Sequence, residues 1–368
     1  MSLRMRPWLD RIEPYRPGRP AASSDGSMAS NESPLGASEH VVRAVTEAAG
    51  QAHHYPDPLA DTLRAELARL HGVCADQILV GNGSDELIFL LSWGYLAHGG
   101  HAVCADPAYR IDEISARVVD ARLTQVPLKD WEHDLEAMAE VDADLAYVVN
   151  PHNPTGTVRP LPDIERFVAS ARAKLVVVDE AYIDFTDDPG KSSAMALARD
   201  GRAVVLRTFS KVHGLAGLRV GYLVGDAEIV AGLRKIRAPF SVGALAQAGA
   251  VAAIRDPRHR ERVREHTLRL RGELVHLLQD TGLAAVPSQA NFVLVRTPHE
   301  EELVDRLARH GISVRPGSSL GLPGTVRISI PTEHGLRLLR RALTPPDRNP
   351  PAAAAHSLEQ IRSEDVHP

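Results

Sequence analysis

Short runs of apolar residues alternate with longer amphipathic stretches over most of the chain. The clearest runs are apolar throughout and occupy residues 101–105, 145–149, 175–178 and 203–206. Such runs are typical of strands in a sheet that helices cover on both faces. Helical stretches separate the runs, for example at residues 161–173. We therefore expect an α/β domain with a mostly parallel sheet, of the seven-stranded type.

The pattern changes after about residue 245. A long polar helical stretch at 255–278 is followed by strand-like segments at 290–295, 312–315 and 326–330 and helical stretches at 300–309 and 333–343. This mixture predicts a smaller α+β domain. The predicted division of the chain is an N-terminal arm at 1–37, a large domain at 38–245, a small domain at 246–343 and a disordered tail at 344–368.

Composition narrows the possible functions. The chain has 368 residues and a net charge of −5, so no basic excess indicates nucleic acid as a partner. Its only two cysteines, Cys74 and Cys104, form neither a disulfide framework nor a metal-ligand spacing, and we expect no metal. We find no secretory signal and no apolar run of membrane-spanning length, so we expect a cytoplasmic protein.

A glycine-rich turn follows the strand-like residues 78–80. Residues 81–86 have the sequence Gly-Asn-Gly-Ser-Asp-Glu and precede an apolar helical stretch. Small residues at a strand-to-helix turn let backbone N–H groups approach an anion, and the helix N-terminus adds its positive dipole end. A tight turn capped by Ser84 or Asp85 is an alternative interpretation.

The most specific window spans residues 206–222. Lys211 follows a buried-type strand, hydroxyl groups precede it at Thr208 and Ser210, and Arg219 follows eight residues later. Hydroxyl groups and a guanidinium suit a phosphate group. An amine beside them suits a Schiff base with an aldehyde.

Two further polar residues follow predicted strands. Asp179 ends the strand at 175–178, and Asn153 lies in the segment 150–156 after the strand at 145–149. The carboxyl ends of parallel strands are where α/β proteins form their sites. A helix N-cap at Asp179 and a simple turn at Asn153 are the alternative interpretations.

Taken in order, these windows resemble the fold-type-I pyridoxal-phosphate-dependent aminotransferases, and most closely the histidinol-phosphate aminotransferase group. The resemblance runs from about residue 6 to residue 343. Its specific parts are the Lys211 window and the segments 150–156 and 179–182; weaker parts are 14–15, 29–34, 54–57 and 288–292.

The resemblance implies pyridoxal 5'-phosphate as the cofactor and gives each residue a role. Lys211 would bind the cofactor covalently and move the substrate proton, and Asp179 would pair with the pyridine nitrogen. Tyr109 would stack on the ring. Asn153 and Tyr182 would hydrogen-bond its phenolic oxygen. The phosphate would be bound by Ser84, Asp85, Thr208, Ser210 and Arg219.

The resemblance also implies a homodimer and a substrate site. Tyr55 would reach the phosphate in the partner subunit. Arg327 would bind the anionic group of the substrate. The remaining substrate residues would be Tyr15, Asn31 and Arg315.

The chain departs from the group's usual sequence at two positions. His152 replaces an asparagine, and we expect a neutral, solvent-facing side chain there. Asp112 stands where the group usually has a tyrosine. A carboxylate in the pocket would repel a phosphate and favour a cationic substrate; alternatively, Asp112 faces solvent or pairs with Arg110 or Arg117.

Three functional hypotheses follow. The first is a ping-pong aminotransferase acting on histidinol phosphate with 2-oxoglutarate. The second keeps the cofactor but uses an aromatic or guanidino amino acid, or is a decarboxylase or oxidase, since the protein selects which bond breaks. The third is a cofactor-binding regulatory domain, which the acidic charge and the lack of a DNA-binding segment before residue 38 disfavour.

Overall fold

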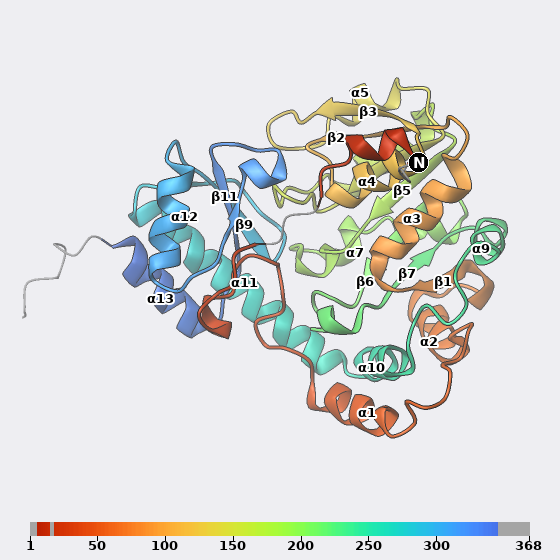
Figure 1. Ribbon diagram of the computed structural model, residues 1–368, viewed down its shortest axis with the longest axis horizontal. Helices are drawn as coiled ribbons and strands as arrows, with labels where there is room; N and C mark the ends of the chain where they lie inside the picture. Colours follow the sequence, from red (N-terminus) through yellow and green to blue (C-terminus); the bar gives the residue numbers. More distant parts are fainter. Residues whose placement is uncertain (1–5, 15–17, 345–368) are drawn as a thin grey trace, which may run out of the picture.

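The computed structural model describes residues 6–14 and 18–344, and a seven-stranded sheet forms the centre of its larger part (Figure 1). The sheet order is β1-β7-β6-β5-β4-β2-β3, and all neighbouring strands are parallel except those beside β7. The strands are β1 (Ile78–Gly81), β2 (His101–Asp106), β3 (Arg122–Pro127), β4 (Leu145–Val149), β5 (Leu175–Asp179), β6 (Val204–Thr208) and β7 (Gly221–Val224). The predicted α/β fold with a mostly parallel sheet is confirmed.

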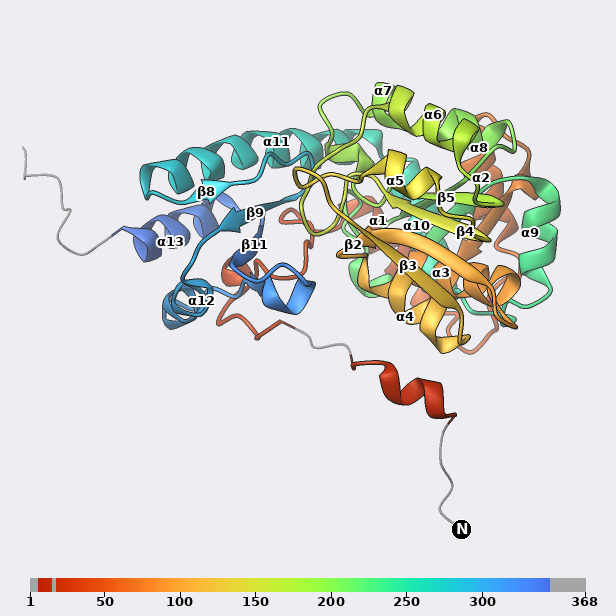
Figure 2. The ribbon, with the colours of Figure 1, turned by 90° about the horizontal axis from the view of Figure 1, so that it is seen from above.

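Helices cover both faces of this sheet because its central strands are apolar on both sides. In β4, Ala146 and Val148 enter one hydrophobic core, whereas Leu145 and Tyr147 enter the other. The first core contains residues of α1 (Glu39–Ala49), α2 (Asp61–His71), α5 (Leu135–Ala139), α6 (Leu161–Ser170), α8 (Met195–Arg199) and α10 (Ala244–Ile254). The second contains residues of α3 (Gly83–Tyr95), α4 (Arg110–Val118) and α9 (Ala227–Arg234). Figure 2 shows α6 and α4 on opposite sides of the strands.

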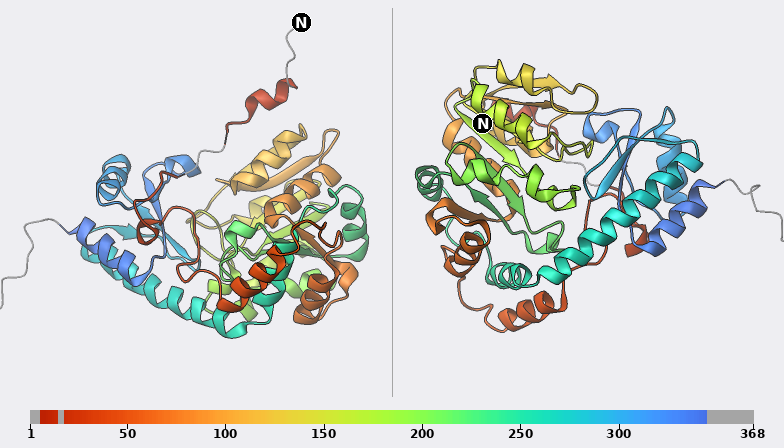
Figure 3. Two further views of the ribbon diagram at one scale, coloured as in Figure 1. Left: turned by 60° about the horizontal axis from the view of Figure 1, so that its bottom comes forward. Right: turned by 180° about the vertical axis from the view of Figure 1, so that it is seen from behind.

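A smaller antiparallel sheet lies beside the large one. It has the order β10-β11-β9-β8, with β8 (Ala284–Ala285), β9 (Phe292–Arg296), β10 (Arg315–Pro316) and β11 (Thr325–Ser329). Its core includes residues of α11 (Pro257–Asp280), α12 (Glu300–Arg309) and α13 (Glu333–Leu343). The long helix α11 connects the two parts (Figure 3). Within the described residues, no helix has the length and apolar character needed to cross a membrane.

Part of the predicted arm belongs to this smaller core. Met28 is fully buried there, its N–H donates to the carbonyl of Ser313, and its carbonyl accepts from Ser329 N. The remaining elements are short: α7 (Pro189–Ser192) and the 3₁₀ turns Pro7–Arg11, Ser24–Gly26, Ala75–Gln77, Ile183–Phe185, Ala216–Leu218 and Ser318–Leu320. The predicted disordered tail lies outside the described residues, apart from Thr344.

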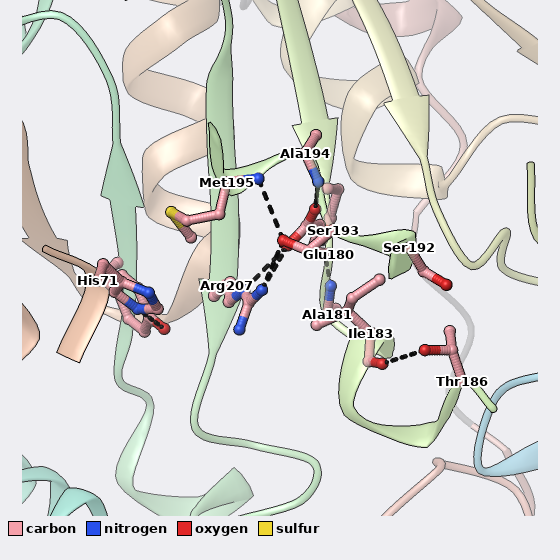
Figure 4. A network of polar contacts seen from close by, with 12 residues as sticks. His71, Glu180, Ala181, Ile183, Thr186, Ser192, Ser193, Ala194, Met195 and Arg207 are labelled. Atoms are coloured by element: carbon pink, nitrogen blue, oxygen red, sulfur yellow. Dashed lines mark hydrogen bonds and ion pairs between the residues drawn. The ribbon is translucent and has the colours of Figure 1, made fainter. Parts of the chain in front are cut away.

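A buried ion pair fastens the carboxyl ends of β5 and β6 to each other (Figure 4). Glu180 directly follows β5, and its carboxylate accepts from Nη2 of Arg207 on β6 at 2.7 Å. The side chains are 1% and 17% exposed. Ser193 also donates to Glu180, and the second carboxylate oxygen accepts from Ala194 N. The pair therefore fixes the positions of the two strand ends, where Asp179 and Thr208 emerge.

We predict that Arg207→Met lowers the free energy of unfolding by about 3–5 kcal/mol, because it leaves the Glu180 charge buried without its partner. Urea unfolding of the purified protein measures this loss. The matched control is Arg172→Met, which breaks a surface pair with Glu140 whose side chains are 61% and 71% exposed. That change should cost less than about 1 kcal/mol. Equal effects of the two substitutions would contradict the structural importance of the buried pair.

Candidate active site

A cavity of about 180 Å³ opens at the carboxyl ends of β4, β5 and β6. These ends meet at one edge because the three strands are parallel neighbours. The lining combines acids, an amine, a guanidinium, hydroxyl groups and two phenols. The residues are Ser30, Glu32, Ser84, Asp85, Tyr109, Val149, Asn153, Asp179, Ala181, Tyr182, Thr208, Ser210, Lys211, Ala216 and Arg219.

Asp179 lines this cavity at the end of β5. Its side chain is buried, and Oδ1 accepts from Ala181 N at 2.9 Å. Burial, together with the nearby charges of Asp85 and Glu180, raises the pKa of this carboxyl to about 7, although the hydrogen bond from Ala181 N and the charge of Lys211 lower it. The carboxyl would therefore be stabilised in its charged form by a cationic group placed in the cavity.

Lys211 lies at the turn that follows β6. Its Nζ is 3.4 Å from the carbonyl oxygen of Ser30 and 5.5 Å from the ring centre of Tyr182. The amine is thus held at the cavity by the N-terminal segment and by an aromatic ring face. It lies in the same cavity as Asp179, as the sequence predicts.

Hydroxyl groups and a helix N-terminus form one side of the cavity. Thr208 donates to Ser210 at 3.0 Å, and Arg219 Nη1 lies 3.4 Å from the same Ser210 oxygen. The helix α3 begins at Gly83, whose φ of +75° favours glycine and where a Cβ atom would displace the Arg219 guanidinium. Backbone N–H groups, hydroxyl groups and a guanidinium together suit a phosphate group.

Asp85 connects this side of the cavity to Tyr109. Its Oδ1 accepts from the Tyr109 hydroxyl and its Oδ2 from Arg219 Nη2, both at 2.9 Å. Burial and the negative charge of Asp85 raise the pKa of Tyr109 well above its usual range. Tyr109 is therefore a neutral hydrogen-bond donor whose ring position is fixed by this bond.

The opposite wall joins the large sheet to the smaller one. The Tyr182 hydroxyl accepts from Nδ2 of Asn31 at 3.1 Å and from Nδ2 of Asn153 at 3.4 Å. Arg327 donates to Oδ1 of Asn153 at 2.6 Å and to the carbonyl of Ala29 at 2.7 Å. Four of the predicted site residues thus form one buried network, although Asn31 and Arg327 do not line the cavity itself.

The other predicted residues lie in different places. Arg315 is buried and lies opposite Arg327 in the backbone register of β10 and β11. It is therefore near the cavity without lining it. Tyr55 is 83% exposed and stacks on Phe240, with ring centres 4.7 Å apart. Tyr15 lies outside the described residues.

The surroundings of the Asp112 side chain differ from those predicted from the sequence. It is 1% exposed, and Arg110 and Arg117 both pair with Glu113, so it neither faces solvent nor pairs with either arginine. It also does not line the cavity. Neither carboxyl oxygen has a hydrogen-bond partner among the described residues, and burial, with the charges of Asp179 and Asp85, raises its pKa well above the usual range. Burial therefore favours the neutral form of this carboxyl.

His152 also differs from the prediction. The side chain is 1% exposed and does not face solvent. The predicted neutral state agrees with the pKa, which burial and the nearby His133 lower well below the usual range. Side-chain direction at this turn depends on packing from the segments around Pro107 and His133, which no local pattern indicates.

Ser30 and Glu32 line the cavity but were not assigned a role from the sequence. They belong to the segment 29–34, which carries part of the family resemblance. That resemblance was the feature of the sequence that could have indicated their place in the cavity. The buried pair of Glu180 and Arg207 was also missed, since each residue merely flanks a more conspicuous neighbour.

We predict that Asp179 makes a contribution to the stability of the cofactor-free protein that is lost as pH rises from about 4 to about 7. In the unfolded chain Asp179 ionises near pH 3.8, whereas in the folded chain it keeps its proton up to about pH 7. This contribution to the free energy of unfolding therefore falls, by about 4 kcal/mol at most. His71, His133 and His213 act in the opposite direction, because burial lowers their pKa values to about 3, 4 and 4. The test is therefore the difference in unfolding free energy between the unchanged protein and Asp179→Asn, measured by urea unfolding across this range. The unchanged protein should lose stability relative to the variant as pH rises, and a constant difference would contradict the assignment.

Comparison with known proteins agrees with this geometry. The family model "Aminotransferase class I and II" matches residues 27–343. The chain is 39% identical to a histidinol-phosphate aminotransferase of Symbiobacterium thermophilum, covering 92% of this chain and 97% of that protein. It is 37% identical to the enzyme of that name from Moorella thermoacetica, covering 90% of each.

A solved structure is similar along almost the whole chain. The histidinol-phosphate aminotransferase of Sinorhizobium meliloti, in complex with pyridoxal-5'-phosphate, superposes with a TM-score of 0.84 at 30% identity. The match covers 93% of this chain and 97% of that one. The chain therefore belongs to the class I and II aminotransferases, the pyridoxal-phosphate-dependent enzymes of fold type I that the sequence predicts.

Proposed function

We propose that this aminotransferase acts on histidinol phosphate, with 2-oxoglutarate as the partner substrate, by a ping-pong mechanism. The donor gives up its amino group and leaves as the carbonyl compound; 2-oxoglutarate then takes up that amino group and leaves as glutamate. The observation that carries the proposal is a single cavity in which Lys211, Asp179 and Arg219 line the walls together. The names of the relatives support histidinol phosphate as the substrate.

The residues present fit pyridoxal 5'-phosphate, the cofactor of this enzyme. A group with a phosphate and a basic ring nitrogen suits a cavity that is lined by Arg219, the Thr208 and Ser210 hydroxyls and the buried carboxyl of Asp179. When bound, the cofactor supplies an aldehyde for the amino group and a ring that accepts the electron pair released at the substrate carbon.

Each residue has a task in this scheme. Lys211 would hold the cofactor covalently and carry the proton to and from the substrate carbon. Asp179 would keep the ring nitrogen protonated, and the positive nitrogen would in turn lower the raised pKa of Asp179. Tyr109, oriented by Asp85, would stack on the ring, while Asn153 and Tyr182 would donate to or accept from its phenolic oxygen.

Charge near the cavity supports an anionic substrate. Arg315 and Arg327 lie opposite each other on two neighbouring strands, and Arg327 donates a hydrogen bond to Asn153 at the cavity wall. The carboxyl of Asp112 does not line the cavity, so it does not argue against a substrate that carries a phosphate. Glu32, which does line the cavity, is suited to a hydrogen-bond donor such as an imidazole N–H. An amino donor with one anionic group and one imidazole satisfies both features.

We also propose that two copies of the chain form the working unit. Tyr55 and Phe240 stack on each other although they are 83% and 40% exposed, so they present an aromatic pair at the surface. Such a pair suits burial against a second protomer.

Both cysteines are free, in keeping with a cytoplasmic enzyme.

Lys211→Ala should abolish the absorbance band of the lysine-linked cofactor, because no other amine lines the cavity among the described residues. Turnover should fall by about 10⁴-fold, the upper range for loss of a proton-transfer group. Spectra of the purified variant after cofactor addition and a standard transamination assay measure the two effects. Lys191→Ala, at an exposed position, is the control and should behave as the unchanged protein. A persistent band in Lys211→Ala would refute the assignment.

Histidinol phosphate should convert the purified enzyme's cofactor to its amine form faster than any other donor. The comparison uses histidinol, which lacks the phosphate, together with glutamate, aromatic amino acids and arginine, and follows the absorbance band with product masses. Loss of the phosphate contacts should slow histidinol by at least about tenfold. Conversion by arginine or an aromatic amino acid, with none by histidinol phosphate, would favour the alternative substrate class, and loss of carbon dioxide would indicate a decarboxylase.

A further inference from the structure

His152 joins three loops that meet behind the cavity wall. It directly precedes Asn153, which lines the cavity, and its Nε2 lies 3.2 Å from the carbonyl oxygen of Pro107. Pro107 is two residues before Tyr109, which lines the cavity on another loop. On its other side, His152 Nδ1 lies 2.9 Å from the hydroxyl of Thr155.

The contacts continue from Thr155 to the third loop. Thr155 and Thr157 have hydroxyl oxygens 2.8 Å apart, and Thr157 donates to the carbonyl of Trp131 at 2.7 Å. Two residues after Trp131, His133 packs its ring edge-on against the ring of His152, with ring centres 4.7 Å apart. Thr155 is fully buried and both histidines are nearly so, so solvent does not compete for these hydrogen bonds.

Counting hydrogens assigns the direction of each bond. A carbonyl oxygen only accepts, so the contact with Pro107 requires the hydrogen of His152 on Nε2. A neutral ring then has a lone pair on Nδ1, which accepts from Thr155. The chain from Pro107 to Trp131 contains four contacts, but a neutral ring and two hydroxyls supply only three hydrogens. The Thr155 hydrogen is therefore shared between His152 and Thr157, whereas the bond to Pro107 has its own hydrogen.

We propose that His152 is a positioning residue, which holds the loop of Tyr109 against the loop of Asn153 through its hydrogen bond to Pro107. The contact crosses 45 residues of sequence and connects the ends of β2 and β4. Because both loops contribute side chains to the cofactor cavity, their separation sets the distance between the stacking ring and the amide. The inference rests on cofactor binding in this cavity and concerns how tightly the cavity holds it.

Two substitutions of His152 distinguish the hydrogen bond made by Nε2 from the one made by Nδ1. Gln reaches as far as Nε2 and can still donate to Pro107, whereas Asn reaches only as far as Nδ1 and retains the contact with Thr155. We expect His152→Asn to raise the dissociation constant of pyridoxal 5'-phosphate about tenfold, a loss of about one hydrogen bond. His152→Gln should stay within about threefold of the unchanged protein. Fluorescence titration of the cofactor-free proteins measures both constants without relying on turnover.

The controls distinguish positioning from general stability. His71 is another buried histidine, bonded to Tyr222 and outside the cavity, so His71→Gln should lower the melting temperature while changing cofactor affinity by less than about threefold. In a Tyr109→Ala background, His152→Asn should lose most of its effect on affinity, because the two residues act through one loop. Thr155→Val, which spares the bond to Pro107, should also stay within about threefold and gives a result even if His152→Asn does not fold.

Several outcomes would overturn the proposal. Equal losses of affinity in His152→Asn and His152→Gln would mean that the bond to Pro107 is not what matters. A full effect of His152→Asn in the Tyr109→Ala background would show that His152 does not act through Tyr109. A tenfold loss in Thr155→Val would assign the role to the threonine chain. A failure of cofactor binding in the unchanged protein would instead reject the cofactor assignment, so the two failures are distinguishable.

Discussion

The parallel alignment of β4, β5 and β6 is the constraint on which the rest of the site depends. Parallel neighbours end at the same edge, so Asp179 and Thr208, the last residues of β5 and β6, and Asn153, which follows β4, all line one cavity. The buried pair of Glu180 and Arg207 adds a direct link between two of these ends. The topology of the sheet therefore brings together the side chains on which the chemistry of the cavity depends.

Burial decides the charge state of the groups gathered there. Asp179 is removed from water and surrounded by other acids, so its pKa rises to about 7, and a cationic ring nitrogen would be bound with a large electrostatic gain. Asp112 has no hydrogen-bond partner among the described residues, and its burial, with the charges of Asp179 and Asp85, raises its pKa well above the usual range. The excess of acid around the cavity is balanced by Lys211 and Arg219, which face into it.

The smaller sheet and the N-terminal segment complete the site from the other side. Met28 anchors the segment in the smaller core, and Asn31 then reaches Tyr182 while Ser30 approaches Lys211. Because these contacts cross between the two parts of the chain, a shift of one part relative to the other would change the cavity wall.

The amino-acid sequence by itself determined the fold class and the main strands within one or two residues, and it predicted that Lys211 and Asp179 lie near each other, as they do in the lining of one cavity. These features follow from local rules: apolar runs form covered strands, and polar residues at their ends meet at one edge. The strands β3, β7 and β8 were missed: β3, at a sheet edge, mixes polar and apolar residues, and β7 and β8 have only four and two residues. Only the tertiary structure decided where His152, Asp112, Glu180 and Arg207 point. Each of these side chains is directed by packing against segments tens of residues away, and a polar residue next to a turn looks the same in sequence whether it faces water or is buried.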